Sequence, residues 1–161
     1  MAVWLRRGLW ISTIAAVVIL ALLPSVSYLG LRHPANLAGM YLLTALAAGA
    51  LYSFSKALGE RLFLLLGLLV VPTAAAGVAL LSAGWEAGGY LIAAAYWGEP
   101  VMGYFIYRRL AGRWRGVFLA SAAAYAYSLP LTLFGLWLVP AVADAVKLAA
   151  LVNLLREPVR L

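Results

Sequence analysis

Cysteine is absent from the sequence, histidine occurs once and charged residues are scarce. The absence of cysteine excludes disulfides, thiolate metal sites and cysteine nucleophiles. A single histidine, His33, excludes a zinc site built from histidines and a haem held by two histidines of one chain. Charged residues make up 11% of the 161 residues, whereas soluble domains carry about 25%. The composition therefore excludes a soluble enzyme domain, and its 66% hydrophobic content also excludes a disordered tail.

The sequence consists largely of long apolar runs, which short charged segments separate. A helix needs about 20 apolar residues to cross the hydrocarbon core of a membrane, and the sequence contains five runs of about that length and a shorter sixth. The predicted fold is all-α, a polytopic transmembrane helix bundle in which residues 1–161 form a single integral membrane domain. The six predicted spans are residues 8–29, 37–55, 62–83, 88–107, 116–138 and 141–155. The short sixth run is also compatible with a helix that lies along the membrane surface.

Basic residues flank these runs unevenly. In a six-span arrangement, ten of the twelve basic residues fall on the side that holds both termini: Arg6, Arg7, Lys56, Arg61, Arg108, Arg109, Arg113, Arg115, Arg156 and Arg160. Only Arg32 falls in an opposite turn, and Lys147 lies within the sixth span. Cytoplasmic loops carry an excess of Lys and Arg. The sequence therefore predicts a plasma membrane protein with both termini in the cytoplasm.

Glu99 is the candidate for chemistry inside the membrane, because it lies about ten residues from either end of the fourth span. An ionised carboxylate at this depth costs about 2.5 kcal/mol or more on insertion scales, so such residues usually face the bundle interior and serve a function. Its neighbours Gly98 and Pro100 favour a kinked or broken helix. Irregular backbone at this depth is tolerated where it is buried in protein or lines a water-filled cavity.

Other polar side chains lie at positions from which they can reach Glu99. Tyr96 shares its span, Ser121, Tyr125 and Ser128 form a polar stripe on the fifth span, and Thr44 and Thr73 are hydroxyls at mid-depth. Such hydroxyls can hold an ion or relay a proton, although for the stripe alone the favoured interpretation is bonding to neighbouring helix carbonyls. We therefore expect an ion- or ligand-binding site drawn from Glu99, Tyr96, Tyr125, Ser128, Asp144 and Lys147.

The two charges of the sixth span need partners. Asp144 and Lys147 are three residues apart on one helix face, so they can pair within the helix, and this is the favoured interpretation. In the alternative, Lys147 pairs with Glu99 across helices. Either pairing reduces the free-energy cost of placing charges inside the membrane.

Three functions from different classes fit these observations. The favoured one is a transporter or channel for an ion or small solute, with Glu99 as an intramembrane protonatable or cation-binding group. The second is a non-catalytic accessory subunit of a larger membrane complex, such as a respiratory or transport complex. The third is an intramembrane enzyme that modifies lipids, for which five acidic residues and one histidine supply few catalytic groups. The sequence predicts no cofactor, no metal site and no catalytic residue.

The expected partners are the lipid bilayer and other membrane subunits, either as a homo-oligomer or within a larger complex. Four arginines in one turn favour a contact with anionic lipid: Arg108, Arg109, Arg113 and Arg115. Because this cluster is short and lies against a membrane, nucleic acid is not an expected partner.

Overall fold

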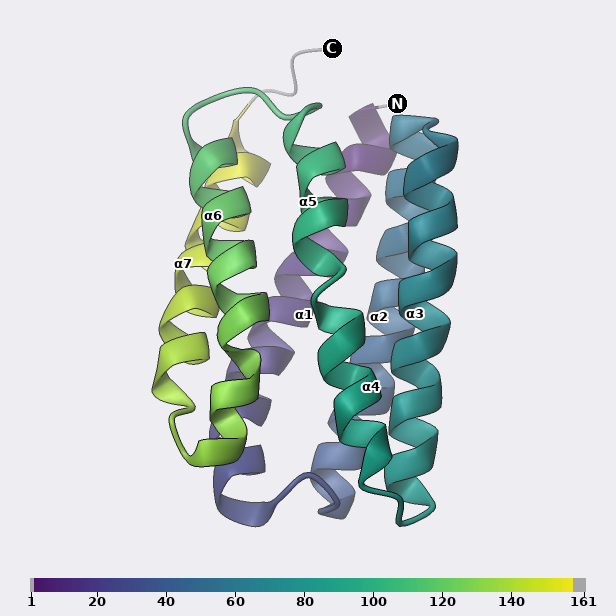
Figure 1. The fold of residues 1–161 in the computed structure, drawn as a ribbon. Coiled ribbons are helices and arrows are strands. Elements are labelled where there is room, and N and C mark those ends of the chain that lie inside the picture. The colour runs from purple at the N-terminus through teal and green to yellow at the C-terminus, as the bar shows by residue number, and fades with distance from the viewer. Residues whose placement is uncertain (1, 158–161) are drawn as a thin grey trace.

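The computed structural model describes residues 2–157 and is helical throughout apart from short turns (Figure 1). The elements are α1 (Ala2–Leu29), α2 (Pro34–Leu58), α3 (Arg61–Ser82), α4 (Ala87–Tyr96), α5 (Glu99–Tyr107), α6 (Trp114–Ser128), the 3-10 helix η1 (Leu129–Phe134) and α7 (Leu138–Arg156). Five stretches are long and apolar enough to cross a membrane: α1, α2, α3, α6 together with η1, and α7. The predicted all-α class is therefore confirmed.

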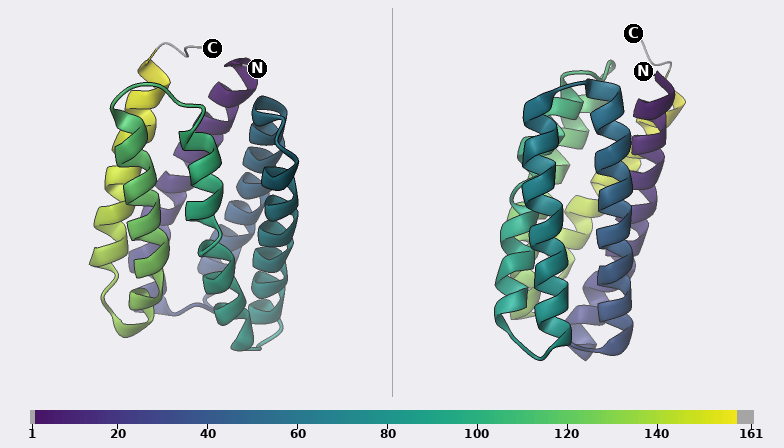
Figure 2. Two further views of the ribbon diagram at one scale, coloured as in Figure 1. Left: turned by 45° about the horizontal axis from the view of Figure 1, so that its top comes forward. Right: turned by 90° about the vertical axis from the view of Figure 1, so that its right-hand side faces the viewer.

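The helices form one bundle and run along a common direction (Figure 2). Helix α1 packs against α2 and α7, α3 packs against α2 and α4, and α6 packs against α5 and α7. Helices α4 and α5 follow one another along a single path down the length of the bundle (Figure 1). The start of α1 lies beside the end of α7, where the Arg6 guanidinium donates to the Leu155 carbonyl at 3.4 Å. Both ends of the described chain thus lie at the same end of the bundle, which we call the terminal end.

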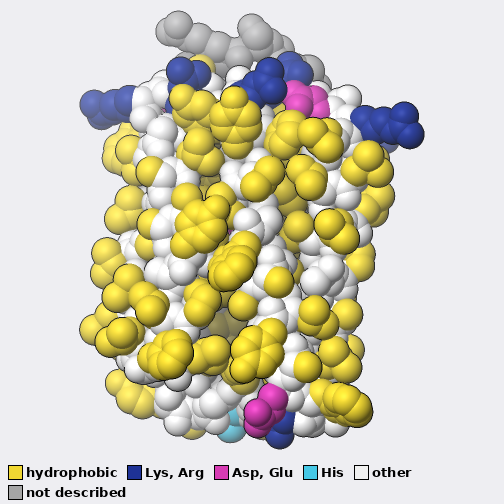
Figure 3. All heavy atoms as spheres, in the orientation of Figure 1, with side chains coloured by type: hydrophobic (Ala, Val, Ile, Leu, Met, Phe, Trp, Pro, Cys, Tyr) yellow, Lys and Arg dark blue, Asp and Glu magenta, His cyan; other side chains and the backbone are white. Residues whose placement is uncertain are grey.

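Apolar side chains cover the outside of the bundle (Figure 3). Leu69 is 67% exposed and Phe134 is 78% exposed, and many other large apolar residues of every long helix face outward. A soluble monomer rarely exposes apolar patches of this extent, whereas a bilayer solvates them. The length, apolarity and outward face of these helices indicate an integral, multi-pass membrane protein.

Some helix bounds differ from the predicted spans. Helix α1 begins at Ala2, so Arg6 and Arg7 lie inside its first turns instead of before it. The predicted fifth span ends early, because Pro130 lacks a backbone N–H and the chain tightens into η1 before Gly135 turns it with a φ of +78°. Leu138 consequently belongs to α7, which has 19 residues and is longer than the predicted sixth span.

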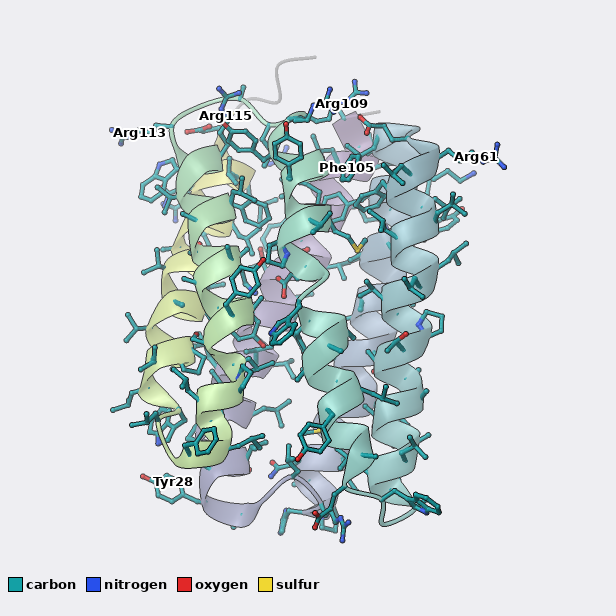
Figure 4. All side chains as sticks on the ribbon, in the orientation of Figure 1. Tyr28, Arg61, Phe105, Arg109, Arg113 and Arg115 are labelled. Atoms are coloured by element: carbon teal, nitrogen blue, oxygen red, sulfur yellow. The ribbon has the colours of Figure 1, made fainter. Side chains whose placement is uncertain are left out.

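Basic side chains gather at the terminal end of the bundle, where Figure 4 labels Arg61, Arg109, Arg113 and Arg115. Arg109 forms an ion pair with Glu60 at 3.3 Å, and the guanidinium of Arg115 lies 5.0 Å from the ring centroid of Tyr107. The opposite end carries Arg32, which lies 3.9 Å from Glu86 and donates to the carbonyl of Gly84. Arg160, which the sequence analysis also assigns to the basic side, lies outside the described residues. The described basic residues thus separate as the sequence analysis predicted.

A dense apolar core fills the half of the bundle near the terminal end. Phe54, Phe63 and Phe105 pack edge to face, with ring centroids 6.4 Å and 6.1 Å apart in that order. Gly8 lets helix α1 pack closely on this core, because a Cβ at this position would lie 2.6 Å from the ring of Phe54. Figure 4 shows Phe105 directed from α5 toward the bundle interior. This core closes the bundle on the side of the basic residues.

Candidate functional site

A helix break positions Glu99 near the middle of the bundle. Helix α4 ends at Tyr96, the residues Trp97 and Gly98 form a turn, and α5 begins at Glu99 (Figure 1). The N–H of Gly98 donates to the Ala95 carbonyl at 3.0 Å, which is the tighter spacing of a 3-10 turn. Pro100 has no N–H to continue the α-helical pattern. The break predicted from Gly98 and Pro100 is therefore present.

Close packing fixes the position of the break. A Cβ on Gly98 would lie 2.5 Å from Cγ2 of Val70 on α3, so this turn of the backbone rests directly against the neighbouring helix. Glu99 follows in the first turn of α5. The partial positive charge of a helix N-terminus favours a carboxylate at this place.

Lys147 on α7 joins two carboxylates. Its Nζ lies 3.1 Å from Oε1 of Glu99 and 2.8 Å from Oδ1 of Asp144. The side chain of Asp144 is fully buried, that of Lys147 is 5% exposed, and that of Glu99 is 34% exposed. The sequence left a choice between pairing within α7 and pairing across helices, and the structure contains both contacts at once. We call Glu99, Asp144 and Lys147 the charged triad.

Two tyrosines complete the polar cluster. The Nζ of Lys147 lies 4.2 Å from the ring centroid of Tyr125. This cation–π contact stabilises the ammonium where it is shielded from water. Tyr96 packs edge to face on Tyr125, with ring centroids 5.8 Å apart. Five of the six residues predicted for the site therefore lie together.

The remaining predicted hydroxyls bond their own helices. Ser128, the sixth predicted site residue, donates to the carbonyl of Tyr125 at 3.2 Å and does not line the cavity described below. Ser121 donates to the carbonyl of Val117, Thr44 to that of Met40 and Thr73 to that of Leu69. Short polar side chains in helices commonly form such bonds to the preceding turn. Of these four hydroxyl residues, only Thr44 lines the cavity.

The triad carries unequal charges. Within residues 2–157, no further basic side chain lies within 4 Å of the carboxylate oxygens of Glu99 or Asp144. Two carboxylates therefore share one ammonium, which leaves one negative charge in excess when all three groups are ionised. Lys147 is the one cationic partner of Asp144 among the described residues, with Nζ 2.8 Å from Oδ1, and Oδ2 has no hydrogen-bond partner among them. Removing charges from water without full compensation costs several kcal/mol per ion.

A cavity of about 290 Å³ lies against the triad and extends along the bundle, from Val26 and Leu31 near the opposite end to Ile106 and Phe118 toward the terminal end. Glu99, Lys147, Tyr96 and Tyr125 form its polar wall, while most of its lining consists of apolar side chains from α1, α2, α3, α4 and η1. The rings of Phe54 and Phe63 close it toward the terminal end. Figure 3 shows a hollow in the apolar surface on the face in view. The charged triad thus forms part of the cavity wall, and the dense core bounds the cavity toward the terminal end.

Two hydroxyl residues that line this cavity were not predicted from the sequence, Ser12 of α1 and Thr132 of η1. Thr132 of η1 lines the cavity, is buried, and its hydroxyl has no hydrogen-bond partner within residues 2–157. A signal was present, since Pro130 two residues earlier interrupts the helix and turns the following side chains.

The chemistry available at the site is that of carboxylates, an ammonium and phenols. Among residues 2–157, no group of three or more His, Cys, Asp or Glu side chains is placed to hold a metal ion. The arrangement can take up or release a proton, or hold a cation, at the carboxylate that faces the cavity. No protein-family model, no curated protein and no solved structure matches this chain.

Proposed function

We propose that the protein moves a proton or another monovalent cation across a membrane, with Glu99 as the group that takes up and releases the charge. The observation that carries this proposal is the unequal charge of the triad, in which the buried carboxylate of Asp144 and the partly exposed carboxylate of Glu99 share Lys147. One further positive charge makes the triad neutral. A neutral triad is the more stable state in a medium of low dielectric constant.

Glu99 is the exchanging group because it is the carboxylate that meets the cavity. Its side chain is 34% exposed and lines the cavity wall, whereas Asp144 is fully buried and does not line it. Asp144 and Lys147 are three residues apart on α7 and act as a fixed pair. Glu99 belongs to a different helix and follows a break, so its side chain can separate from Lys147 without moving α7.

We extend the proposal to the arrangement in the membrane. Helices α4 and α5 together form one broken span, which gives six spans with both termini in the cytoplasm of a cell whose plasma membrane holds the protein. The basic residues at the terminal end support this orientation under the positive-inside rule. In this arrangement Arg108, Arg109, Arg113 and Arg115 meet the anionic headgroups of the inner leaflet.

Reconstitution into liposomes tests the proposal. Wild-type protein should conduct protons or alkali cations down an imposed gradient, measured with a dye for internal pH and with ion-selective electrodes. Glu99→Gln should fold but lose this flux, because the amide has nearly the same shape and cannot exchange a charge. Glu86→Gln is the matched control, since Glu86 is an exposed acid at the far end of the bundle and should leave the flux unchanged.

Two outcomes would overturn the proposal. Unchanged flux in Glu99→Gln would remove Glu99 from the mechanism. An inactive wild type that is folded and inserted would favour the accessory-subunit alternative, in which the triad only joins α5 to α7.

A further inference from the structure

The cavity beside the triad has more room and more apolar wall than a bare proton or metal cation requires. We propose that it binds a small organic ammonium ion, whose apolar body fills the cavity and whose charged nitrogen meets Glu99. This inference rests on the proposed function, because it names the chemical class of the cation that Glu99 takes up.

The size and lining of the cavity favour an organic occupant. Its volume of about 290 Å³ lies near the lower end of the range for small-molecule pockets, about 300–1,000 Å³. Side chains such as Ile19, Leu43, Val70 and Ile92 supply most of its wall. An alkali cation is selected by rings of oxygen ligands that replace its hydration shell, whereas this wall presents a single carboxylate group. The apolar body of an organic ion, in contrast, can contact the apolar side chains that form most of the wall.

Charge complementarity selects an ammonium head. The Nζ of Lys147 lies closer to Asp144 than to Glu99, at 2.8 Å against 3.1 Å, so Asp144 can compensate Lys147 while Glu99 binds the ligand. A ligand with one positive charge then makes the site neutral. An organic acid would bring a third carboxylate to a triad that already has one negative charge in excess, and a neutral alcohol would leave that charge uncompensated.

The cavity reaches the surface of the bundle beside η1. Leu133 of η1 lines the cavity and is also 56% exposed, which places it at the mouth. Leu129 and Pro130 of η1 and Ala93 of α4 also line the cavity. Because the surrounding surface is apolar and faces lipid, an amphiphilic cation dissolved in the bilayer can pass between α4 and η1 without crossing water.

Calorimetric titration of the detergent-solubilised, full-length protein tests this inference. The three probes share the adamantane cage and differ in their polar group. 1-Adamantylammonium should bind. 1-Adamantanol should bind at least about tenfold more weakly, the loss expected when a hydrogen bond to a charged group is removed. 1-Adamantanecarboxylate should not bind. Titration into empty micelles gives the background for each probe, and Glu99→Gln should abolish the preference for the ammonium over the alcohol.

Matched substitutions locate the binding site. Ala93→Leu places a larger side chain inside the cavity and should weaken ammonium binding, while Ala94→Leu at the next, exposed position should not. Ala74→Leu on α3 fills the cavity from the opposite helix and gives a second test if Ala93→Leu does not fold. Equal binding of ammonium and alcohol, no binding of any probe, or unchanged affinity in a folded cavity-filling variant would overturn the inference.

The two proposals fail in different ways. Proton flux that depends on Glu99, combined with no binding of 1-adamantylammonium, would overturn the organic-cation site alone. Glu99-dependent binding of 1-adamantylammonium without any flux would support the site and overturn transport.

Discussion

Lys147 supplies the positive charge that compensates two carboxylates inside the bundle. Its ammonium contacts Glu99 and Asp144 and lies over the ring of Tyr125. A buried group of this kind contributes little net stability compared with an apolar core, but it becomes strongly destabilising when one partner is removed. The triad is therefore a sensitive point of the molecule. Its effect on stability can be measured separately from any transport.

We expect Lys147→Met to lower the free energy of unfolding by about 3–5 kcal/mol, because two carboxylates then lack their shared cation. The double variant Lys147→Met with Asp144→Asn should recover part of this loss, since the amide removes the fully buried charge. Thermal unfolding followed by circular dichroism in one detergent measures both effects. Lys56→Met, at an exposed position in the last turn of α2, is the control and should change stability little. A Lys147→Met protein as stable as wild type would contradict the charged state assigned to the triad.

At the scale of elements, α3 and α4 pack backbone to backbone. A Cβ on Gly88 would lie 2.3 Å from the carbonyl oxygen of Gly77 and 2.7 Å from the amide nitrogen of Leu81. Small residues permit such close approach between membrane helices, where van der Waals packing replaces the hydrophobic effect as the driving force. This contact places α4 against α3. Because it fixes the position of α4, it also affects the distance between α4 and η1 at the mouth of the cavity.

Gly88→Ala should destabilise the protein by about 1–3 kcal/mol, the usual range for overpacking, because backbone atoms cannot move aside as a flexible side chain can. Gly116→Ala is the matched control. Gly116 lies in α6 with open space around its Cβ position, so alanine should leave stability unchanged or raise it by up to about 1 kcal/mol. Unfolding in the same detergent compares the two variants. Equal stability of both would show that α3 and α4 are not in backbone contact.

At the scale of the whole molecule, charge and packing divide the bundle into two halves. The basic residues and the aromatic core of Phe54, Phe63 and Phe105 occupy the terminal end, and the cavity extends from this core toward the opposite end. The mouth inferred beside η1 lies away from the basic residues. Under the proposed function, a solute that crosses the bundle must therefore pass this aromatic core. The break at Trp97 and Gly98 separates α4 from α5 next to Glu99.

Single cysteines test the orientation, because the native chain has none. In intact cells or right-side-out vesicles, an impermeant thiol reagent should label Glu86→Cys and should not label Arg113→Cys or Arg156→Cys. Permeabilised membranes should allow labelling of all three, since these positions are exposed at the ends of the bundle. Labelling of Arg156→Cys from outside would place the end of α7 on the opposite side and contradict the six-span arrangement.

Several features could be predicted from sequence because local properties determine them. Hydropathy and the lack of charge indicate apolar helices, since backbone polar groups in lipid must bond within their own helix or a closed barrel. The break before Pro100 was also predictable, although proline alone does not produce one, because Pro24 and Pro72 lie inside continuous helices. The close contact of Gly98 with Val70 distinguishes this position, and that contact belongs to the tertiary structure.

By itself, the sequence determined the class of protein and named six polar residues of interest, of which Ser128 lies apart from the cluster and five lie together: Glu99, Tyr96, Tyr125, Asp144 and Lys147. Only the tertiary structure decided that Lys147 contacts both carboxylates. The spacing of three residues to Asp144 is local, whereas Glu99 is 48 residues away and reaches Lys147 because α6 packs against both α5 and α7. The cavity likewise has no local signal. It is the volume left after the side chains of separate helices have packed, and that volume depends on all of them together.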